Sequence, residues 1–264
     1  MIGRNLLCTL ILCVIASYAV ASDLTITILY DNYSCNEALE TGHGFSCLIE
    51  GTGKTVLFDT GNKGKILLGN MDKLGLSPKA IDIILLSHVK QDHIGGLSDV
   101  LAINSSVTVY TPEGFPERIR NKVTNAGTRC EELPNSVEIC KAVHAIGKPT
   151  KKVKEKSLVI ETEKGLVLIT ACAHVGIVKL VKSAKKLLGK DVYLIIGGLH
   201  LCATEPERIQ KIAANLQKEG VKKVAPTHCS GDRTKELFLE AYGENFITVG
   251  VGKKVTIEDA LPAK

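Results

Sequence analysis

The sequence predicts a layered α/β protein, and three observations support this fold class. The 264-residue chain is 45% hydrophobic and 23% charged, which is ordinary for a soluble globular protein. Short runs rich in Ile, Val and Leu fill the first half, and runs of this kind alternate with helical patterns in the second half. The chain contains no repeat or low-complexity tract, so we expect one compact domain.

The expected strands are short apolar runs bounded by Gly, Asp or Asn. They cover residues 24–30, 44–50, 55–59, 81–87, 166–170, 192–196 and 222–225. Residues 177–188 carry an apolar face opposite a lysine-rich face, which predicts an amphipathic helix that stops at Gly189. A further helix is expected to open at Thr204, where Glu207 three residues later completes a capping box, and to close at Gly220.

The first 21 residues are expected to lie outside this domain. Arg4 is followed by an apolar run over residues 6–20, and the segment ends in Ala19-Val20-Ala21, a pattern typical of a cleaved secretory signal peptide. The run is shorter than the roughly 20 apolar residues of a membrane-spanning helix, and polar residues interrupt it. We therefore expect a secreted or periplasmic protein whose domain covers residues 22–264, with no stable membrane span.

Charge and aromatic content exclude some classes of partner. Lys and Arg exceed Asp and Glu by 33 − 28 = 5, without the clustered excess of nucleic-acid-binding proteins. Aromatic residues make up 4% of the chain and Trp is absent, so stacking platforms for single strands or carbohydrates are not expected. The composition is compatible with a small, anionic substrate.

Seven cysteines follow residue 21, and this odd number leaves at least one thiol unpaired. In an oxidising compartment Cys130 and Cys140 could close a loop, which the chain-entropy model values at roughly 3 kcal/mol. Seven cysteines are too few for a fold held together by disulfides. Cysteine content therefore points to an ordinary hydrophobic core.

The strongest functional signal is the placement of the histidines. Four of the seven follow an apolar strand directly: His88, His174, His200 and His228. Ligands bind at the carboxyl ends of strands in layered α/β folds, and Asp92-His93 adds a carboxylate and another imidazole after the first of these strands. A lone histidine at a strand end is usually a loop residue, but four alike favour a metal site. Imidazoles with a carboxylate suit zinc, iron or manganese.

The segment around these residues resembles a known motif. Residues 87–96, Ser-His-Val-Lys-Gln-Asp-His-Ile-Gly-Gly, are similar to the His-x-His-x-Asp-His-x-Gly-Gly segment of the metallo-β-lactamase superfamily, with Lys90 where the second His is expected. Phe58-Asp59-Thr60-Gly61 resembles its strand-turn motif. Within the superfamily the chain resembles the branch of 7,8-dihydropterin-6-ylmethyl-4-(β-D-ribofuranosyl)aminobenzene 5′-phosphate synthases, through residues 43–46, 70–97, 170–176, 197–201 and 226–231.

This resemblance implies a four-layer αββα sandwich that holds one or two divalent ions. By motif position, His88 and Lys90 belong to the first site. Asp92, His93 and His228 belong to the second site. Cys172 and His174 would share a face of an extended strand, so either or both can reach the metal.

Four further residues are interpreted outside these two sets of ligands. His200 is either a substrate contact or a spare ligand, and Asp59 is expected to orient a ligand rather than bind metal. Cys229 and His144 are interpreted as structural, the first as a packed thiol.

Lys90 is the main departure from the motif, because an ammonium group has no lone pair for a metal. A unit charge about 4.5 Å from a divalent ion costs roughly 7 kcal/mol at an effective dielectric of ~20. We therefore expect one tightly bound metal per chain, with Lys90 anchoring an anionic group of the substrate. Two alternatives stay open: the side chain turns to solvent, or a neutral amine coordinates the ion.

Three functions follow from these patterns. The first is a secreted metal-dependent hydrolase of an ester, phosphoester or amide, with Asp92, Lys90 and His200 at the reacting centre and zinc as the expected metal. The second is a transferase that joins a pterin to a ribofuranosylaminobenzene phosphate, which the signal peptide disfavours because folate-like intermediates are made in the cytosol. The third is a degenerate binding protein without catalytic metal, which Lys90 favours.

Overall fold

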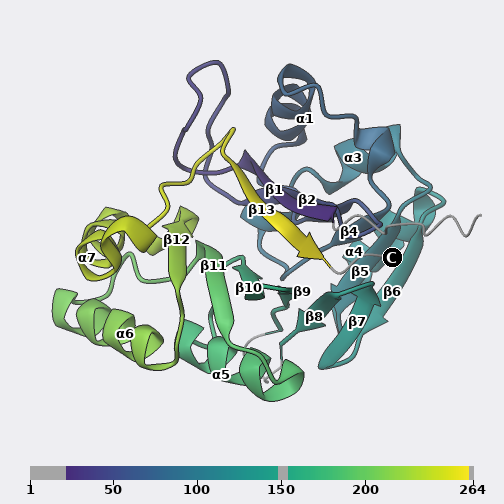
Figure 1. Ribbon diagram of the computed structural model, residues 1–264. Helices are drawn as coiled ribbons and strands as arrows, with labels where there is room; N and C mark the ends of the chain where they lie inside the picture. The colour runs from purple at the N-terminus through teal and green to yellow at the C-terminus, as the bar shows by residue number, and fades with distance from the viewer. Residues whose placement is uncertain (1–21, 148–153, 262–264) are drawn as a thin grey trace, which may run out of the picture.

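The computed structural model describes residues 22–147 and 154–261, and its two β-sheets pack face to face (Figure 1). The expected signal peptide lies outside the described residues. In spatial order the first sheet contains β13 (Lys254–Leu261), β1 (Ser22–Tyr30), β2 (Ser46–Glu50), β3 (Val56–Phe58), β4 (Ile83–Leu85), β5 (Thr108–Pro112) and β6 (Arg129–Leu133). The second contains β12 (Lys223–Thr227), β11 (Val192–Gly198), β10 (Gly165–Thr170), β9 (Ser157–Thr162), β8 (Val143–Ile146) and β7 (Ser136–Cys140).

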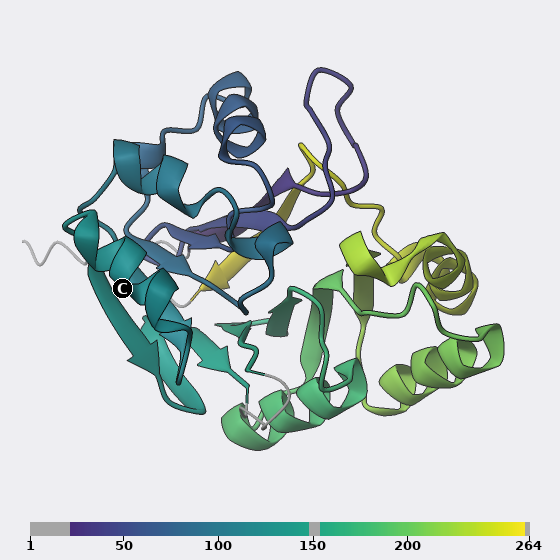
Figure 2. The same ribbon diagram turned by 180° about the vertical axis from the view of Figure 1, so that it is seen from behind.

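Helices cover the outer faces of both sheets, as Figure 2 shows from behind. Apolar residues of α1 (Gly64–Lys73), α3 (Leu97–Ile103) and α4 (Glu117–Asn125) pack on the first sheet. Those of α5 (Ile177–Leu188), α6 (Pro206–Lys218) and α7 (Asp232–Tyr242) pack on the second. The short helix α2 (Gln91–Ile94) and three 3₁₀ turns, Pro78–Ala80, His228–Ser230 and Gly243–Asn245, complete the described elements. The αββα sandwich is thus confirmed.

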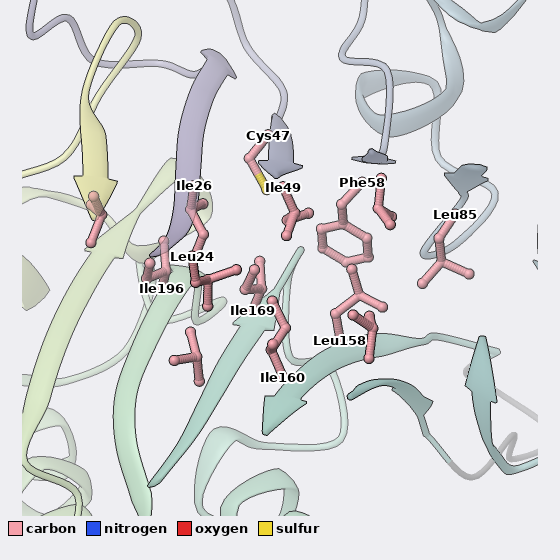
Figure 3. Packing of buried hydrophobic residues seen from close by; sticks show 14 of the residues in the cluster. Leu24, Ile26, Cys47, Ile49, Phe58, Leu85, Leu158, Ile160, Ile169 and Ile196 are labelled. Carbon is pink, nitrogen blue, oxygen red and sulfur yellow. The ribbon is translucent and has the colours of Figure 1, made fainter. Parts of the chain in front are cut away.

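The main hydrophobic core lies between the two sheets (Figure 3). Phe58 of the first sheet and Leu158 of the second are fully buried in it. In β10, Val167 and Ile169 face this core, whereas Leu166 and Leu168 face the helices of the second sheet. A strand that is buried on both faces needs an uninterrupted apolar run, which is why the sequence displays these strands so clearly.

Parallel pairing brings the ends of several strands to one edge of each sheet. β3, β4 and β5 pair in parallel in the first sheet, and β10, β11 and β12 do so in the second. The carboxyl ends of these strands carry the motif residues. Their loops therefore meet where the two sheets come together.

Most sequence-based element predictions are confirmed, since each expected strand matches a strand with ends shifted by a few residues at most. The helix over residues 177–188 is also confirmed, and it ends at Gly189, which has a left-handed conformation. The capping box at Thr204 is wrong. The second helix begins at Pro206 with Glu205 as its N-cap residue and without a side-chain cap, because proline is well suited to the first helical position.

The suggested disulfide between Cys130 and Cys140 is also wrong. β6 and β7, which carry these residues, are the edge strands of different sheets, and all seven cysteines after residue 21 are free. In the described ranges, no helix combines the length and apolarity that crossing a membrane requires.

Candidate metal centre

The candidate site is built from loops that follow four strands. The loop after β4 carries His88, Asp92 and His93, and the loops after β10, β11 and β12 carry the other candidate ligands. Backbone strain concentrates here: of the five non-glycine residues with positive φ in the described ranges, four follow β3, β10, β11 or β12, namely Asp59 (58°), Ala173 (55°), His200 (54°) and His228 (50°). Each such conformation costs about 1–3 kcal/mol and persists when the surroundings impose it.

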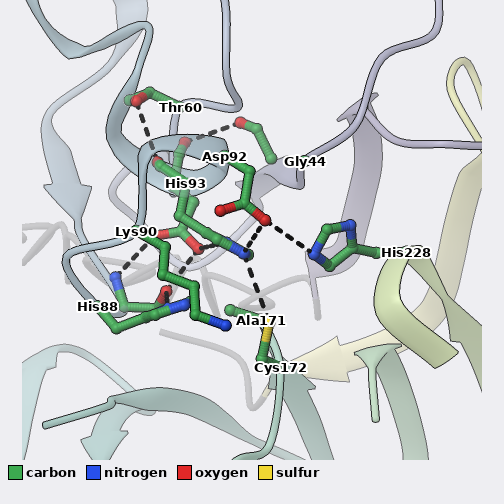
Figure 4. A network of polar contacts seen from close by, with 12 residues as sticks. Gly44, Thr60, His88, Lys90, Asp92, His93, Ala171, Cys172 and His228 are labelled. Atoms are coloured by element: carbon green, nitrogen blue, oxygen red, sulfur yellow. Dashed lines mark hydrogen bonds and ion pairs between the residues drawn. The ribbon is translucent and has the colours of Figure 1, made fainter. Parts of the chain in front are cut away.

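Asp92, His93 and His228 converge as the motif implies (Figure 4). The Asp92 Oδ2 atom lies 3.3 Å from His93 Nε2 and 3.5 Å from His228 Nε2. The exposed His43 approaches the same carboxylate oxygen, with its Nε2 atom at 3.3 Å. This set offers one carboxylate and two imidazoles to a metal ion, with His43 at the entrance.

Hydrogen bonds fix the ring orientation of these histidines. Asp59 Oδ2 accepts from His93 Nδ1 at 2.8 Å and from Ser87 Oγ at 2.6 Å. Ser87 Oγ in turn lies 2.8 Å from His88 Nδ1 and accepts its proton, because the serine proton is already donated to Asp59. One buried carboxylate therefore orients two imidazoles, which is the arrangement expected of a residue that orients metal ligands.

His228 is oriented in the same way from another loop. Its Nδ1 atom lies 2.9 Å from Asn32 Oδ1 and donates to it. The hydrogen-bond network thus places the ring proton on Nδ1 of His88 and His228 and leaves the Nε2 lone pair free. Both Nε2 atoms are buried and have no hydrogen-bond partner among the described residues. A buried polar atom without a partner costs free energy, so the Nε2 lone pairs of both histidines are suited to coordinate a metal ion.

Cys172 lies at the centre of the cluster. Its Sγ atom is 3.5 Å from His93 Nε2, and it belongs to three of the four groups whose ligand atoms can hold one ion. Cys229 Sγ lies 3.4 Å from Cys172 Sγ and completes one of those groups with His228. Cys229 is therefore a candidate ligand as well as the packed thiol that the sequence suggests.

His174 and His200 form the outer part of the site, with ring centroids 4.5 Å apart. His174 Nδ1 donates to Glu155 at 3.0 Å, and its Nε2 atom accepts from Lys90 Nζ at 3.0 Å. Lys90 is exposed, and its Nζ atom nevertheless contacts His174, so the side chain lies along the entrance of the site. His200 is exposed and joins Cys172 and His174 in one candidate group.

Burial and charge set the protonation of the inner residues. Burial alone would lower the pKa of His93, but the Asp59 carboxylate outweighs it and, with Asp92, raises this pKa to about 9. Burial and the nearby His93 charge lower the pKa of His88 and of His228 to about 3. Burial alone would raise the pKa of Asp92, but its hydrogen bond to His93 holds the pKa below its ordinary value.

Comparison with known proteins identifies the family of the chain. Residues 39–139 match the family model of the metallo-β-lactamase superfamily. The chain is 31% identical to the 7,8-dihydropterin-6-methyl-4-(β-D-ribofuranosyl)-aminobenzene-5′-phosphate synthase of Methanocaldococcus jannaschii, over 86% of this chain and 94% of that protein. The chain belongs to the metallo-β-lactamase superfamily.

Solved structures of the superfamily show the same fold. A protein described as a metal-dependent hydrolase of the β-lactamase superfamily superposes with a TM-score of 0.75 and 26% identity, over 88% of this chain and 98% of that chain. The short form of human tRNase Z superposes with a TM-score of 0.58 and 17% identity, over 88% and 98%. The latter likeness concerns the fold alone.

Sequence reasoning overlooked several residues that orient or approach the candidate ligands. Glu155 and Asn32 lie in loops without periodicity, and no motif identifies them. His43 lies in residues 43–46, one of the segments that carry the family resemblance, and this position is the sequence feature that could have identified it. His144, interpreted as structural, pairs with Glu161 at 2.9 Å and belongs to none of the candidate groups among the described residues.

The protonation of His93 predicts a pH-dependent metal affinity. In the metal-free protein its Nε2 carries a proton below pH about 9, and a metal must displace this proton, whereas His88 and His228 are already neutral. Apparent zinc affinity should therefore rise by up to roughly tenfold per pH unit from about pH 6.5 to about pH 9. Chelator competition at several pH values measures it, and a constant affinity over this window would contradict the assignment.

The raised pKa of His93 also predicts that the stability of the metal-free protein falls as pH rises. Because the folded-state pKa of His93 is raised, its ion pair with Asp59 contributes its full stability below about pH 6.5, and this contribution is lost as pH rises through about 9. Denaturant titrations of the metal-free protein across this pH range should show this loss of stability. Opposite slopes for affinity and stability identify His93 as their common origin.

Proposed function

We propose that the protein is a metal-dependent hydrolase of a small anionic ester, phosphoester or amide. The observation that supports this proposal is the convergence of Asp92, His93 and His228, with ring orientations set by Asp59 and Asn32. Mixed nitrogen and oxygen ligands suit zinc, and also iron or manganese. The 26% identical hydrolase with the same fold supports the hydrolytic reaction.

The residues of the chain have separate roles in this proposal. Asp92, His93 and His228 would hold the ion, with Cys172 and His88 beside them. When bound, a divalent ion supplies Lewis acidity and lowers the pKa of coordinated water to about 7. Asp59 keeps the His93 imidazole aligned, and the exposed His200 and Lys90 at the entrance are placed to contact the substrate.

A transferase is the second candidate, because the 31% identical relative is a synthase of a pterin-containing phosphate. The proposed export of the protein separates the two candidates. A native protein that begins near Ser22 and is found outside the cytosol supports the hydrolase, and mass spectrometry measures this start. A cytosolic protein that retains residues 1–21 would favour the synthase.

The third candidate, a binding protein without metal, differs in metal content. We expect the purified protein to hydrolyse an activated ester or phosphodiester, to lose this activity with a chelator and to regain it with Zn²⁺ or Mn²⁺. His144→Ala, which changes a part-buried histidine outside the candidate groups, is the matched control and should behave like the wild type. A protein that purifies without metal and gains no activity when metal is added would contradict the proposal.

A further inference from the structure

The position of Lys90 determines how many cations the site needs. Lys90 stands where the family motif has a metal-binding histidine, and the structure shows what its side chain does there. Its Nζ atom donates to His174 Nε2 at 3.0 Å, and Figure 4 shows the side chain extending past His88 toward Cys172. The positively charged end of Lys90 thus lies among the histidines that would form the first metal site.

The partner of Lys90 is held rigidly. Glu155 is buried and accepts the backbone N–H groups of Cys172, Ala173 and His174 at 3.0, 2.9 and 2.8 Å. The same carboxylate accepts His174 Nδ1–H at 3.0 Å, so the proton of this ring is on Nδ1. His174 therefore presents a fixed Nε2 lone pair, and Lys90 uses the lone pair that a metal in the first site would require.

The charges around the site balance with one divalent ion. Three carboxylates lie against the imidazoles, those of Asp59, Asp92 and Glu155. Lys90 adds one positive charge, so the sum with neutral imidazoles and protonated cysteine thiols is −3 + 1 = −2. One divalent cation neutralises this charge, whereas two would leave the site at −2 + 4 = +2. Coulomb repulsion between Lys90 and a nearby second ion adds to this excess.

We infer that the Lys90 ammonium takes the place of the second metal ion, so that the protein binds one divalent ion, at Asp92, His93 and His228. This inference rests on the proposed metal-dependent function and deepens it. An ammonium has three N–H donors, and His174 uses one of them. Because Lys90 is exposed, the two others are accessible and anchor an anionic group of the substrate.

Metal stoichiometry tests the inference without any activity measurement. After dialysis against buffered Zn²⁺, elemental analysis should give one tightly bound ion per wild-type chain. Lys90→His restores a motif ligand and removes the charge, and should bind two. Lys90→Arg keeps the charge without adding a ligand and should stay at one. Lys211→His, on the exposed face of α6, controls for metal binding to any added histidine and should also stay at one.

The possible outcomes are distinguishable. Two tightly bound ions in the wild type would overturn the inference and leave the metal-dependent function intact. No bound ion would overturn the proposed function itself. A folded Lys90→His variant that stays at one ion would also overturn the inference, and circular dichroism establishes that the variant is folded.

Inorganic phosphate tests the anchoring role. Lys90→Met should weaken phosphate binding roughly tenfold or more, since charge-assisted hydrogen bonds are among the stronger polar contacts. Lys90→Arg should retain most of the affinity. Titration calorimetry of the zinc-loaded proteins measures both, and unchanged phosphate affinity in Lys90→Met at equal metal content would overturn this role.

Discussion

Asp92→Ala should give a folded protein that loses its metal and roughly a thousandfold of its catalytic efficiency. The Asp92 Oδ2 atom is the shared partner of His93, His228 and His43, at 3.3, 3.5 and 3.3 Å. Its loss removes the carboxylate ligand from the set. Metal ions supply several kcal/mol of transition-state stabilisation, and each 1.36 kcal/mol corresponds to a factor of ten in rate.

Metal content, kcat/KM and unfolding of the metal-free protein together test this prediction. Asp72→Ala, which removes an exposed carboxylate on α1, is the matched control and should leave all three unchanged. An Asp92→Ala variant that keeps its metal would refute the assignment. If metal and activity fall only in proportion to lost folded protein, the role of Asp92 is structural.

The metal content of two cysteine variants, measured together with Asp92→Ala, assigns the sulfur ligand. Cys172 Sγ lies 3.5 Å from His93 Nε2, whereas Cys229 Sγ contacts Cys172 at 3.4 Å. Loss of metal in Cys172→Ser but not in Cys229→Ser would identify Cys172 as the thiolate ligand. Loss in both variants would show that the pair acts together.

The sequence predicts the strand framework and most candidate ligands, for one physical reason. β4, β10, β11 and β12 are short apolar runs, and a polar residue directly after such a run stands out. Parallel pairing of β10, β11 and β12 then places their ends at one edge, so linear order translates into proximity. His174 and His200 meet for this reason, and His228 reaches the same cluster through Cys172.

Other features depend on contacts between loops, which leave no periodic signal. Glu155 precedes β9 but binds the loop after β10, and Asn32 follows β1 but binds His228. The direction of Lys90 depends on where His174 presents its lone pair. The disulfide prediction failed because Cys130 and Cys140, although near in sequence, lie on different sheets.

Glu155→Ala should have the largest effect on stability, although no motif identifies this residue. Its buried carboxylate accepts three consecutive backbone N–H groups and the His174 ring, all within 3.0 Å. Removing it leaves two buried N–H donors and one part-buried N–H donor without partners, at about 1–3 kcal/mol each, so the free energy of unfolding should fall by roughly 3–9 kcal/mol. The positive φ of Ala173 also loses the contacts that impose it.

Denaturant titration of metal-free protein measures this effect without a contribution from metal binding. Glu161→Ala is the matched control, since its half-exposed carboxylate pairs with His144 and Lys190 and should cost less than about 1 kcal/mol. A loss in Glu155→Ala as small as in this control would show that the carboxylate does not hold the loop.

Acid should reduce the difference in the free energy of unfolding between the wild type and Glu155→Gln. Burial alone would raise the pKa of Glu155, but the hydrogen bond and charge of His174 outweigh it and lower the pKa to about 2. A lowered folded-state pKa gives stability that is present above the unfolded value of about 4.3 and is lost as pH falls toward 2. The stability difference should therefore be constant near neutral pH and shrink over this window. A difference that stays constant down to pH about 2 would mean that the charge of Glu155 is not what holds His174 and its loop.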